Sequence, residues 1–373
     1  MKEVRPVASE PRIALAHPMI GDDEKRAVMD VLDSGQLAQG PVVAAFEEAF
    51  ARWIGVEHAI AVSSGTAGLH LALLAHGVGS GDEVITTPFT FIASANAVLF
   101  TGATPVFVDV EPDTFCIDPA LVEAAITTRT RAILPVHLYG HPAAMTELSA
   151  IARRHRLVLI EDACQAHGAT VGGRKVGALG HTAVFSLYPT KNMTSAEGGF
   201  VTTDDAAIAG AIRSLRQHGE SERYHHEELG YNYRMTDVAA AIGLAQLVRV
   251  DAFNAARRRH AGVLSKGLAG LDGLTTPVER SGYAHVYHQY TLRIAEGREG
   301  LRSRLAARGI ASGVYYPVPV HRQPVYARRG YDRQSFPVAE RMAREVLSIP
   351  VHPALNDADL ERIVRVVREE PEE

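Results

Sequence analysis

The feature of the sequence that most constrains its fold is an alternation of apolar and helical segments between residues 58 and 203. The apolar segments read HAIAVS, DEVITT, TPVFVDV, RAILPVHL, LVLIED, AVFSL and GGFVTT. Most are separated by stretches with helical periodicity, which predicts an α/β domain with a mostly parallel sheet. Because the segments are apolar almost throughout, we expect helices on both faces, an α/β/α arrangement. In such sheets ligands bind at the carboxyl ends of the strands.

The remainder of the chain predicts further helices and a second, smaller domain. Helical patterns precede and follow the alternation, over residues 22–33, 41–55 and 237–270. An α+β region comes next, with expected strands over 285–294 and 311–316 and expected helices over 301–309, 336–349 and 357–369. The 373 residues exceed the usual size of one domain. We therefore expect a flexible N-terminal arm, a large domain and a small C-terminal domain, over residues 1–12, 13–251 and 252–373.

Composition and charge argue against several classes of function. The formal net charge of -5 provides no overall basic field, which disfavours nucleic acid as the main partner. The two cysteines, Cys116 and Cys164, cannot build a disulfide framework, and a reducing, cytoplasmic setting fits. No run approaches the roughly 18 apolar residues that span a bilayer, and the first residues lack the apolar core of a signal peptide. The histidines match no standard metal-site spacing, so we expect no metal.

A single lysine, Lys191, lies in a polar loop between the last two apolar segments of the alternation. The stretch from Ala183 to Thr203 reads AVFSLYPTKNMTSAEGGFVTT, which predicts strand, loop and strand. A loop held between two buried strands restricts the position of a side chain, as a reactive amine requires. A lone lysine is nevertheless most often a solvated loop residue, so its interpretation depends on the neighbouring strand ends.

Three other strand ends carry groups that a ligand could use. Gly65 and Thr66 open a helix after the first segment, where free N–H groups favour an anion, although Ser and Thr there are also common as ordinary N-caps. Asp162 and Gln165 follow the segment LVLIED. An acidic group there needs a partner, such as a protonated ring nitrogen, unless it caps the next segment. Phe91 can stack on a flat cofactor or pack in the core.

Together these strand ends supply an amine, a carboxylate, an anion site and an aromatic ring. Pyridoxal 5′-phosphate (PLP) requires a Schiff-base lysine, an acidic partner for its pyridinium nitrogen and a phosphate site. The protonated ring would draw electrons from the substrate, and Lys191 would move the proton. Partial burial should lower the pKa of Lys191 for this role. The combination matches the requirements of a PLP enzyme.

An ordered set of motifs across nearly the whole chain resembles a known family. The set comprises SGTA, PFTFIASANAVLFTGATPVFVDV, EDACQAHG, FSLYPTKNMTSAEGG, GYNYRMTD, HVYHQY and YYPVPVH. It resembles the DegT/DnrJ/EryC1/StrS family of PLP-dependent sugar aminotransferases, from about Ile13 to the C-terminal helix. The resemblance implies the fold-type I aminotransferase architecture and a homodimer with active sites at the subunit interface.

The resemblance also implies how the cofactor would be held. Lys191 would form the internal aldimine, and Asp162 would pair with the pyridinium nitrogen. Gln165 would lie beside the phenolic oxygen, and Phe91 would stack on the ring. The phosphate would be held by Gly65, Thr66 and Ser186, and by Asn232 of the partner subunit.

The resemblance implies transfer of an amino group, from L-glutamate, to a nucleotide-linked keto-sugar, with a 4-keto-6-deoxyhexose as the first choice. Tyr316 and His321 would lie on the substrate side, and Arg234 would contact a carboxylate of the amino donor. The open alternatives are a 3-keto sugar or an aminocyclitol precursor as acceptor, and a PLP-binding regulator without turnover. Related sugar dehydratases carry histidine at the lysine position, so Lys191 argues against dehydration.

Overall fold

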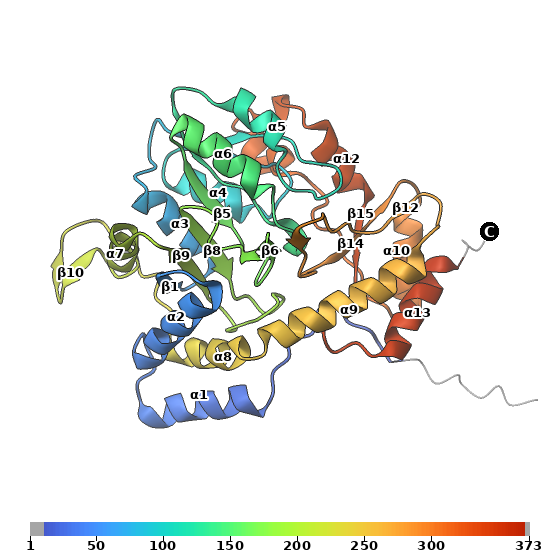
Figure 1. The fold of residues 1–373 in the computed structure, drawn as a ribbon, viewed down its shortest axis with the longest axis horizontal. Coiled ribbons are helices and arrows are strands. Elements are labelled where there is room, and N and C mark those ends of the chain that lie inside the picture. The colour runs from blue at the N-terminus through green and yellow to red at the C-terminus, as the bar shows by residue number, and fades with distance from the viewer. Residues whose placement is uncertain (1–10, 370–373) are drawn as a thin grey trace, which may run out of the picture.

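The computed structural model describes residues 11–369 and shows helices packed on both faces of a central sheet (Figure 1). The strands of this sheet are His58–Val62 (β1), Glu83–Thr86 (β2), Thr104–Phe107 (β3), Thr130–Ile133 (β4), Val158–Asp162 (β5), Thr182–Ser186 (β8) and Gly199–Thr203 (β9). The 7 strands lie in the order β1-β9-β8-β5-β4-β2-β3. β9 runs antiparallel to β1 and β8, and the other pairings are parallel. The predicted mostly parallel sheet is confirmed.

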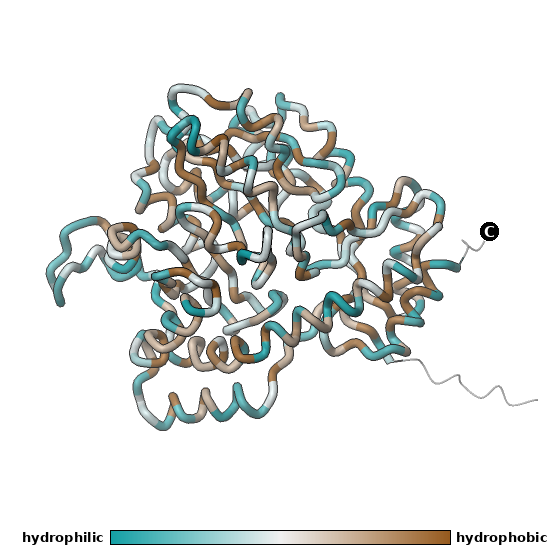
Figure 2. Tube along the Cα trace, in the orientation of Figure 1, coloured by the Kyte–Doolittle hydropathy of each residue, from teal (hydrophilic) through white to brown (hydrophobic). Residues whose placement is uncertain are grey.

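Both faces of the sheet are buried, as the apolar strands predict. Along β1, Ala59 and Ala61 pack in one core cluster, whereas Ile60 and Val62 pack in another. This alternation follows from the two-residue period of a strand, which sends successive side chains to opposite faces. In Figure 2 hydrophobic residues mark the interior of the body. The α/β/α arrangement therefore rests on two separate apolar layers.

Most of the predicted helices are present. The longer helices are Asp22–Ser34 (α1), Pro41–Ile54 (α2), Gly65–Ala75 (α3), Ala93–Phe100 (α4), Met145–His155 (α6), Ala206–Leu215 (α7), Asp237–Leu247 (α8) and Val250–Leu268 (α9). Short helical turns cover Pro119–Val122 (α5), Glu123–Ala125, Leu138–Gly140, Val320–Arg322, Pro324–Ala327 (α11) and Tyr331–Arg333. α3 follows β1 directly, with Ser64 as its N-cap accepting a hydrogen bond from the amide of Ala67.

The prediction of one long helix over residues 237–270 was wrong. α8 and α9 are separate helices that meet at an angle of 57°. The side chains of Gln246 and Arg249 flank the break, and both bond to the buried carboxylate of Glu24 in α1. These contacts tie the break to α1. Among the described residues no single helix is long and apolar enough to cross a bilayer, although this bent pair passes by length and composition.

The C-terminal region is an α+β unit, but its strands differ from those predicted. A sheet of 3 strands contains Leu274–Thr275 (β12), Tyr290–Ile294 (β14) and Val346–Ile349 (β15) in that order. Residues 346–349 were predicted to be helical, but they form β15, which pairs antiparallel with β14. The expected strand over 311–316 is reduced to one bridge, between Gly313 and Ser348. Tertiary pairing thus overrode local periodicity.

Helices Arg298–Ala307 (α10), Pro337–Glu345 (α12) and Asp357–Arg368 (α13) complete the C-terminal region. Short strands elsewhere cover Thr170–Val171 (β6), Arg174–Lys175 (β7), Glu220–Glu222 (β10), His225–His226 (β11) and Tyr283–Ala284 (β13). The hairpin β10–β11 projects beyond the body and is largely hydrophilic (Figures 1 and 2).

The proposed division into an arm and two domains stays a prediction. Residues 1–10 of the expected flexible arm lie outside the described residues. Ile13 pairs with Ile310 and is buried in the same core cluster as β14 and β15. Conversely, Tyr326 and Phe336 of the C-terminal region share a core cluster with strands β2 and β4 of the large sheet. The two regions are therefore tied together by side chains that cross in both directions.

Candidate active site

A cavity of about 400 Å³ lies at the carboxyl ends of β1, β5 and β8, and we call it the central cavity. It brings together most of the residues predicted to form the site, namely Gly65, Thr66, Phe91, Asp162, Gln165, Ser186, Lys191 and Tyr316. The cavity is therefore located where the rule for parallel sheets predicts a ligand site.

Lys191 lies in the loop between β8 and β9, as the strand–loop–strand pattern predicts. Its side chain is only partly exposed and lines the central cavity. Burial lowers the pKa of Lys191, although Cys164 and Asp162 act in the opposite direction. The direction matches the sequence prediction, and it increases the share of neutral amine at neutral pH. The next residue, Asn192, is buried and fixes the loop through hydrogen bonds to Asn254 and to the carbonyl of Val286.

Asp162 is the last residue of β5 and is 4% exposed. Its Oδ2 accepts a 2.7 Å hydrogen bond from Ser94, and its Oδ1 accepts one of 3.2 Å from the amide of Cys164. The hydroxyl of Ser94 lies 3.0 Å from that of Thr90. The carboxylate is thus oriented by groups on two elements. Sequence reasoning missed Ser94, which lies three residues after Phe91 at the start of α4.

Gln165 and Tyr316 lie next to each other in the lining of the central cavity. The amide oxygen of Gln165 accepts a 2.8 Å hydrogen bond from the backbone N–H of Tyr139, and its Nε2 lies 3.2 Å from the hydroxyl of Tyr316. Burial raises the pKa of Tyr316, so its hydroxyl stays protonated at neutral pH. Phe91 is 53% exposed and its ring centre lies 6.0 Å from that of Tyr316. The ring of Phe91 therefore keeps a free surface for stacking.

The N-terminus of α3 lines the central cavity at the place where the sequence predicts an anion site. Gly65 is packed so closely that a Cβ atom there would lie 2.9 Å from both Cys164 Sγ and Ser186 Cβ. Glycine is thus required by space at this position. The first N–H groups of a helix lack partners within the helix and favour negative charge. Gly65, Thr66 and Ser186 are together here, as predicted.

A buried Glu–His pair begins at the residue before Asp162. Glu161 and His137 are both fully buried, with 2.9 Å between Oε2 and Nε2. Glu161 also accepts hydrogen bonds from the amides of Gly177, Leu179 and Gly180. This carboxylate therefore anchors the loop before β8, which supports the site without lining it.

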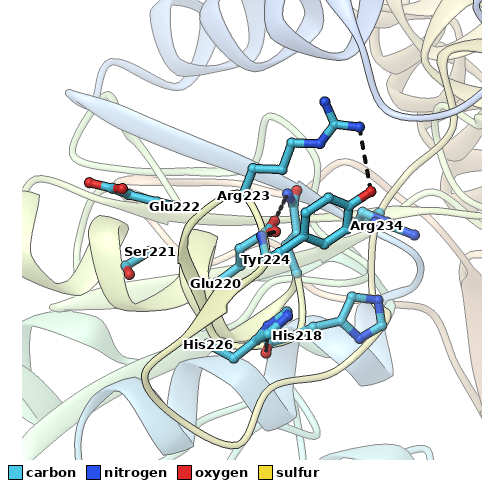
Figure 3. A pocket seen from close by; sticks show the side chains of 9 residues that line it. His218, Glu220, Ser221, Glu222, Arg223, Tyr224, His226 and Arg234 are labelled. Carbon is cyan, nitrogen blue, oxygen red and sulfur yellow. Dashed lines mark hydrogen bonds between the residues drawn. The ribbon is translucent and has the colours of Figure 1, made fainter.

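Three residues predicted for the site lie outside the central cavity. His321 is buried, with its Nε2 3.1 Å from Glu340, and its predicted contact with substrate stays a prediction. Asn232 is exposed and lies beside Gln217. Arg234 lines a second, open space of about 820 Å³ beside the hairpin β10–β11, which we call the hairpin hollow (Figure 3). Its other lining residues are Gln217, His218, Glu220, Ser221, Glu222, Arg223, Tyr224 and His226.

The model of one protein family, the DegT/DnrJ/EryC1/StrS aminotransferase family, matches residues 18–368. The chain belongs to this family. One relative is the dTDP-3-amino-3,4,6-trideoxy-alpha-D-glucose transaminase of Streptomyces venezuelae, which is 45% identical over 97% of each chain. Another is a pleiotropic regulatory protein of Geobacillus stearothermophilus, 44% identical over 92% of this chain and 93% of the relative.

Solved structures of family members share the fold. DesV of S. venezuelae, in complex with a ketimine intermediate, has a TM-score of 0.94 at 43% identity and covers 96% of this chain and 98% of its own. A putative sugar aminotransferase of Streptococcus pneumoniae in its PLP form has a TM-score of 0.91 at 29% identity, covering 96% and 98%. The predicted fold-type I architecture is confirmed, and the chain is a sugar aminotransferase of this family.

Proposed function

We propose that this chain is a cytoplasmic, PLP-dependent aminotransferase that transfers an amino group from L-glutamate to a nucleotide-linked keto-sugar. The observation that carries the proposal is the single cavity that joins the amine of Lys191, the carboxylate of Asp162 and the N-terminus of α3. These groups come from separate strand ends, and each meets a different requirement of the cofactor. Family membership supports the same reaction class.

The residues present fit PLP at both ends of the central cavity. The phosphate end has a helix N-terminus with Gly65 at a position that a Cβ would fill. The ring end has the buried Asp162 carboxylate, which accepts hydrogen bonds from Ser94 and Cys164 and forms no salt bridge among the described residues. When bound, PLP supplies an aldehyde that condenses with amines and a ring that accepts the electron pair left at the substrate carbon.

The residues of the chain would then hold the pyridine ring of PLP and move a proton between carbon atoms. Asp162 keeps the ring nitrogen protonated, because a buried carboxylate favours a positive partner. Lys191 takes the proton from one carbon and returns it to another, and its lowered pKa gives it the neutral amine that this requires. Gln165 would hydrogen-bond the phenolic oxygen of the cofactor. Tyr316, whose hydroxyl lies 3.2 Å from Gln165 Nε2, would face the substrate. Phe91 excludes water from one face of the ring by stacking.

The bound cofactor can be located directly. Protein purified with PLP should absorb in the visible range, and borohydride reduction should leave a pyridoxyl group on Lys191, as read by peptide mass spectrometry. Lys191→Ala should lose both signals. A pyridoxyl group on another lysine in wild type would overturn the assignment.

The acceptor is tested with a panel of nucleotide-linked keto-sugars and glutamate as donor. We propose a 4-keto-6-deoxyhexose first. A 3-keto sugar is the alternative, because a relative that covers the full chain is named for a 3-amino sugar. An aminocyclitol precursor belongs in the same panel. Formation of 2-oxoglutarate with one acceptor identifies the substrate, and absence of turnover with all of them would contradict the proposed function.

We also propose a homodimer in which each site uses Asn232 of the partner subunit, with Arg234 as the candidate contact for a carboxylate of the amino donor. Both residues lie outside the central cavity, and the adjoining hairpin β10–β11 projects from the body (Figure 1). Lys191→Ala and Asn232→Ala each inactivate a different half of a shared site. Co-expressed, they should form hybrids with one intact site and regain about a quarter to a half of the activity expected for two sites. Hybrids without activity would contradict sharing.

The sequence leaves a PLP-binding regulator without turnover as an alternative, and the relative from Geobacillus is named a pleiotropic regulatory protein. The keto-sugar panel separates the two. A regulator would form the visible chromophore with PLP yet produce no 2-oxoglutarate with any acceptor, whereas an aminotransferase would do both.

A further inference from the structure

The segment from His285 to Gln289 is irregular, although the sequence predicts a strand there. Its backbone is bonded from several elements instead. The amides of Val286 and Gln289 donate to the carbonyls of Gly140 and Tyr139. The carbonyl of Val286 accepts from Asn192, the residue after Lys191. We call this stretch, residues 285–289, the clamped segment.

A buried arginine completes this arrangement. Arg257 of α9 is 5% exposed and donates hydrogen bonds of 3.1 and 3.3 Å to the carbonyls of Tyr287 and His288. Burial lowers its pKa to about 10, so it remains charged at neutral pH. Burying a cation costs free energy, and hydrogen bonds to the two carbonyls offset part of this cost. The same hydrogen bonds hold the carbonyls in place. The clamped segment is therefore placed with little freedom beside the lysine loop.

The clamped segment presents His288 to the central cavity. The ring lines the cavity and is 6% exposed. Neither ring nitrogen has a hydrogen-bond partner among the described residues, and of the two only Nδ1 is fully buried. Nε2 is thus the nitrogen open to the cavity. A molecule bound in the cavity can therefore form a hydrogen bond with Nε2, whereas the buried Nδ1 stays without a partner within the described part of the chain.

The charge of this ring restricts what it can bind. Burial, followed by the charge of Lys191, holds the pKa of His288 well below 6.5. The imidazole is therefore neutral at working pH and can donate or accept one hydrogen bond at Nε2. A neutral ring suits a hydroxyl or carbonyl oxygen, whereas a carboxylate prefers a cation such as arginine. Lys191 and His288 line the same cavity, and the lysine charge acts on the imidazole, so we infer that the oxygen that His288 reaches lies near the carbon at which Lys191 acts.

We propose that His288 is a specificity residue that hydrogen-bonds, through Nε2, a sugar hydroxyl next to the carbon that receives the amino group. This inference rests on the proposed function and adds a requirement to it. The acceptor must carry a free hydroxyl beside its keto group. A site with such a group rejects the deoxygenated analogue, because its nitrogen is then left unpaired.

The test compares His288→Phe with wild-type holoenzyme on two acceptors, a keto-sugar with the adjacent hydroxyl and its deoxygenated analogue. Phenylalanine keeps a ring and removes the hydrogen bond. We expect kcat/KM for the hydroxylated sugar to fall about 10-fold to 100-fold, with less than about 3-fold change for the analogue. The first half-reaction, conversion of the bound cofactor by glutamate, should also change by less than about 3-fold.

Binding gives a second measurement that needs no turnover. In the Lys191→Ala background, calorimetry should show about 10-fold weaker binding of the hydroxylated sugar when His288→Phe is added, and no change for the analogue. His288→Gln keeps a hydrogen-bonding group and should restore part of the discrimination. This variant also keeps the proposal testable if phenylalanine impairs folding.

His167 provides a matched control. It is fully buried, and burial followed by the charge of Lys191 lowers its pKa to about 3, but it does not line the central cavity. His167→Phe should affect both sugars by the same factor. Equal losses on both sugars for His288→Phe, or a loss in the glutamate half-reaction, would overturn the proposal. Absence of wild-type turnover with every acceptor would instead contradict the proposed function.

Discussion

The central cavity and the hairpin hollow are held in different ways. In the central cavity the side chains that matter come from strand ends, and buried hydrogen bonds orient them, as Ser94 orients Asp162. In the hairpin hollow the contacts are among exposed residues close in sequence, such as the bond from the amide of Tyr224 to Glu220. The residues described for the first region all belong to one chain. The second region is an exposed surface, and we expect contact with the partner subunit to fix the positions of its side chains.

This difference predicts where substitutions act. Substitutions in the central cavity should lower kcat or the free energy of unfolding. Substitutions in the hairpin hollow should instead affect dimer formation or the KM for substrate.

The largest contrast should come from Lys191→Ala and Arg234→Ala. Loss of the amine removes the group that moves the proton, so we expect turnover to fall at least about 10⁴-fold. Arg234→Ala removes only a proposed charge contact with the amino donor and should raise KM about 10-fold with little change in kcat. Steady-state kinetics with glutamate check both. Comparable losses in kcat would show that the two regions do not differ as described.

The next contrast concerns stability. Glu161→Gln replaces a fully buried carboxylate that accepts bonds from His137 and three amides. It should lower the free energy of unfolding by about 3 kcal/mol, measured by urea denaturation. Glu222→Gln, in the exposed hairpin, is the matched control and should leave the unfolding midpoint unchanged. An unchanged midpoint for Glu161→Gln would refute the anchoring role.

The effect of Glu161→Gln should also depend on pH. Burial alone would raise the pKa of Glu161, but hydrogen bonds from His137, Gly180 and Gly177 outweigh it and hold the pKa below its ordinary 4.5. A lowered folded-state pKa stabilises the protein above the ordinary value, and this stabilisation is lost as pH falls through the lower value. The difference in free energy of unfolding between wild type and Glu161→Gln should therefore become smaller below about pH 4.5. A gap that widens there would contradict the pairing.

A smaller effect is expected for Asn192→Ala. The substitution removes two buried hydrogen bonds, to Asn254 and to the carbonyl of Val286, and should cost about 2 kcal/mol of stability. It should also lower kcat, because the loop of Lys191 loses its anchor. Ser221→Ala removes an exposed hydroxyl contact with His225 and serves as the control from the hairpin. Equal melting temperatures for the two variants would count against the clamp.

The smallest effect should come from Ser94→Ala. Asp162 would keep its bond from the amide of Cys164 and lose the one from the Ser94 hydroxyl. A hydrogen bond to a charged group contributes about 1.5 kcal/mol, so we expect kcat/KM to fall about 10-fold. Thr90→Val, which removes only the hydroxyl behind Ser94, should change it less. The reverse order would indicate that Thr90, and not Ser94, orients the carboxylate.

Sequence reasoning found the central cavity because its chemistry lies at the ends of recognisable strands. Asp162 and Lys191 could be placed in this way, and the sheet then fixed their proximity. Ser94 and His288 were missed for a physical reason. Ser94 reaches Asp162 across 68 positions of sequence, and His288 is presented by an irregular segment that backbone bonds from distant elements hold in place.

The errors in the fold have the same origin. The apolar residues of β15 fit a helical pattern locally, and only pairing with β14 makes them a strand. The residues that flank the break between α8 and α9 bond to Glu24, more than 200 residues earlier in the chain. The periodicity of apolar residues indicates only local structural preference, so it does not predict contacts between segments that are remote in sequence.

The buried bond from Asn192 to Val286 has a consequence for how such chains can be recombined. A chimera that exchanges the C-terminal region at the junction of α8 and α9 would carry Asn254, Arg257 and the clamped segment as one block. The lysine loop would stay with the other parent. We therefore expect the new specificity to be inherited best when the recipient also has an amide side chain after its lysine, because Asn192 bonds to both Asn254 and the carbonyl of Val286 in the transferred block.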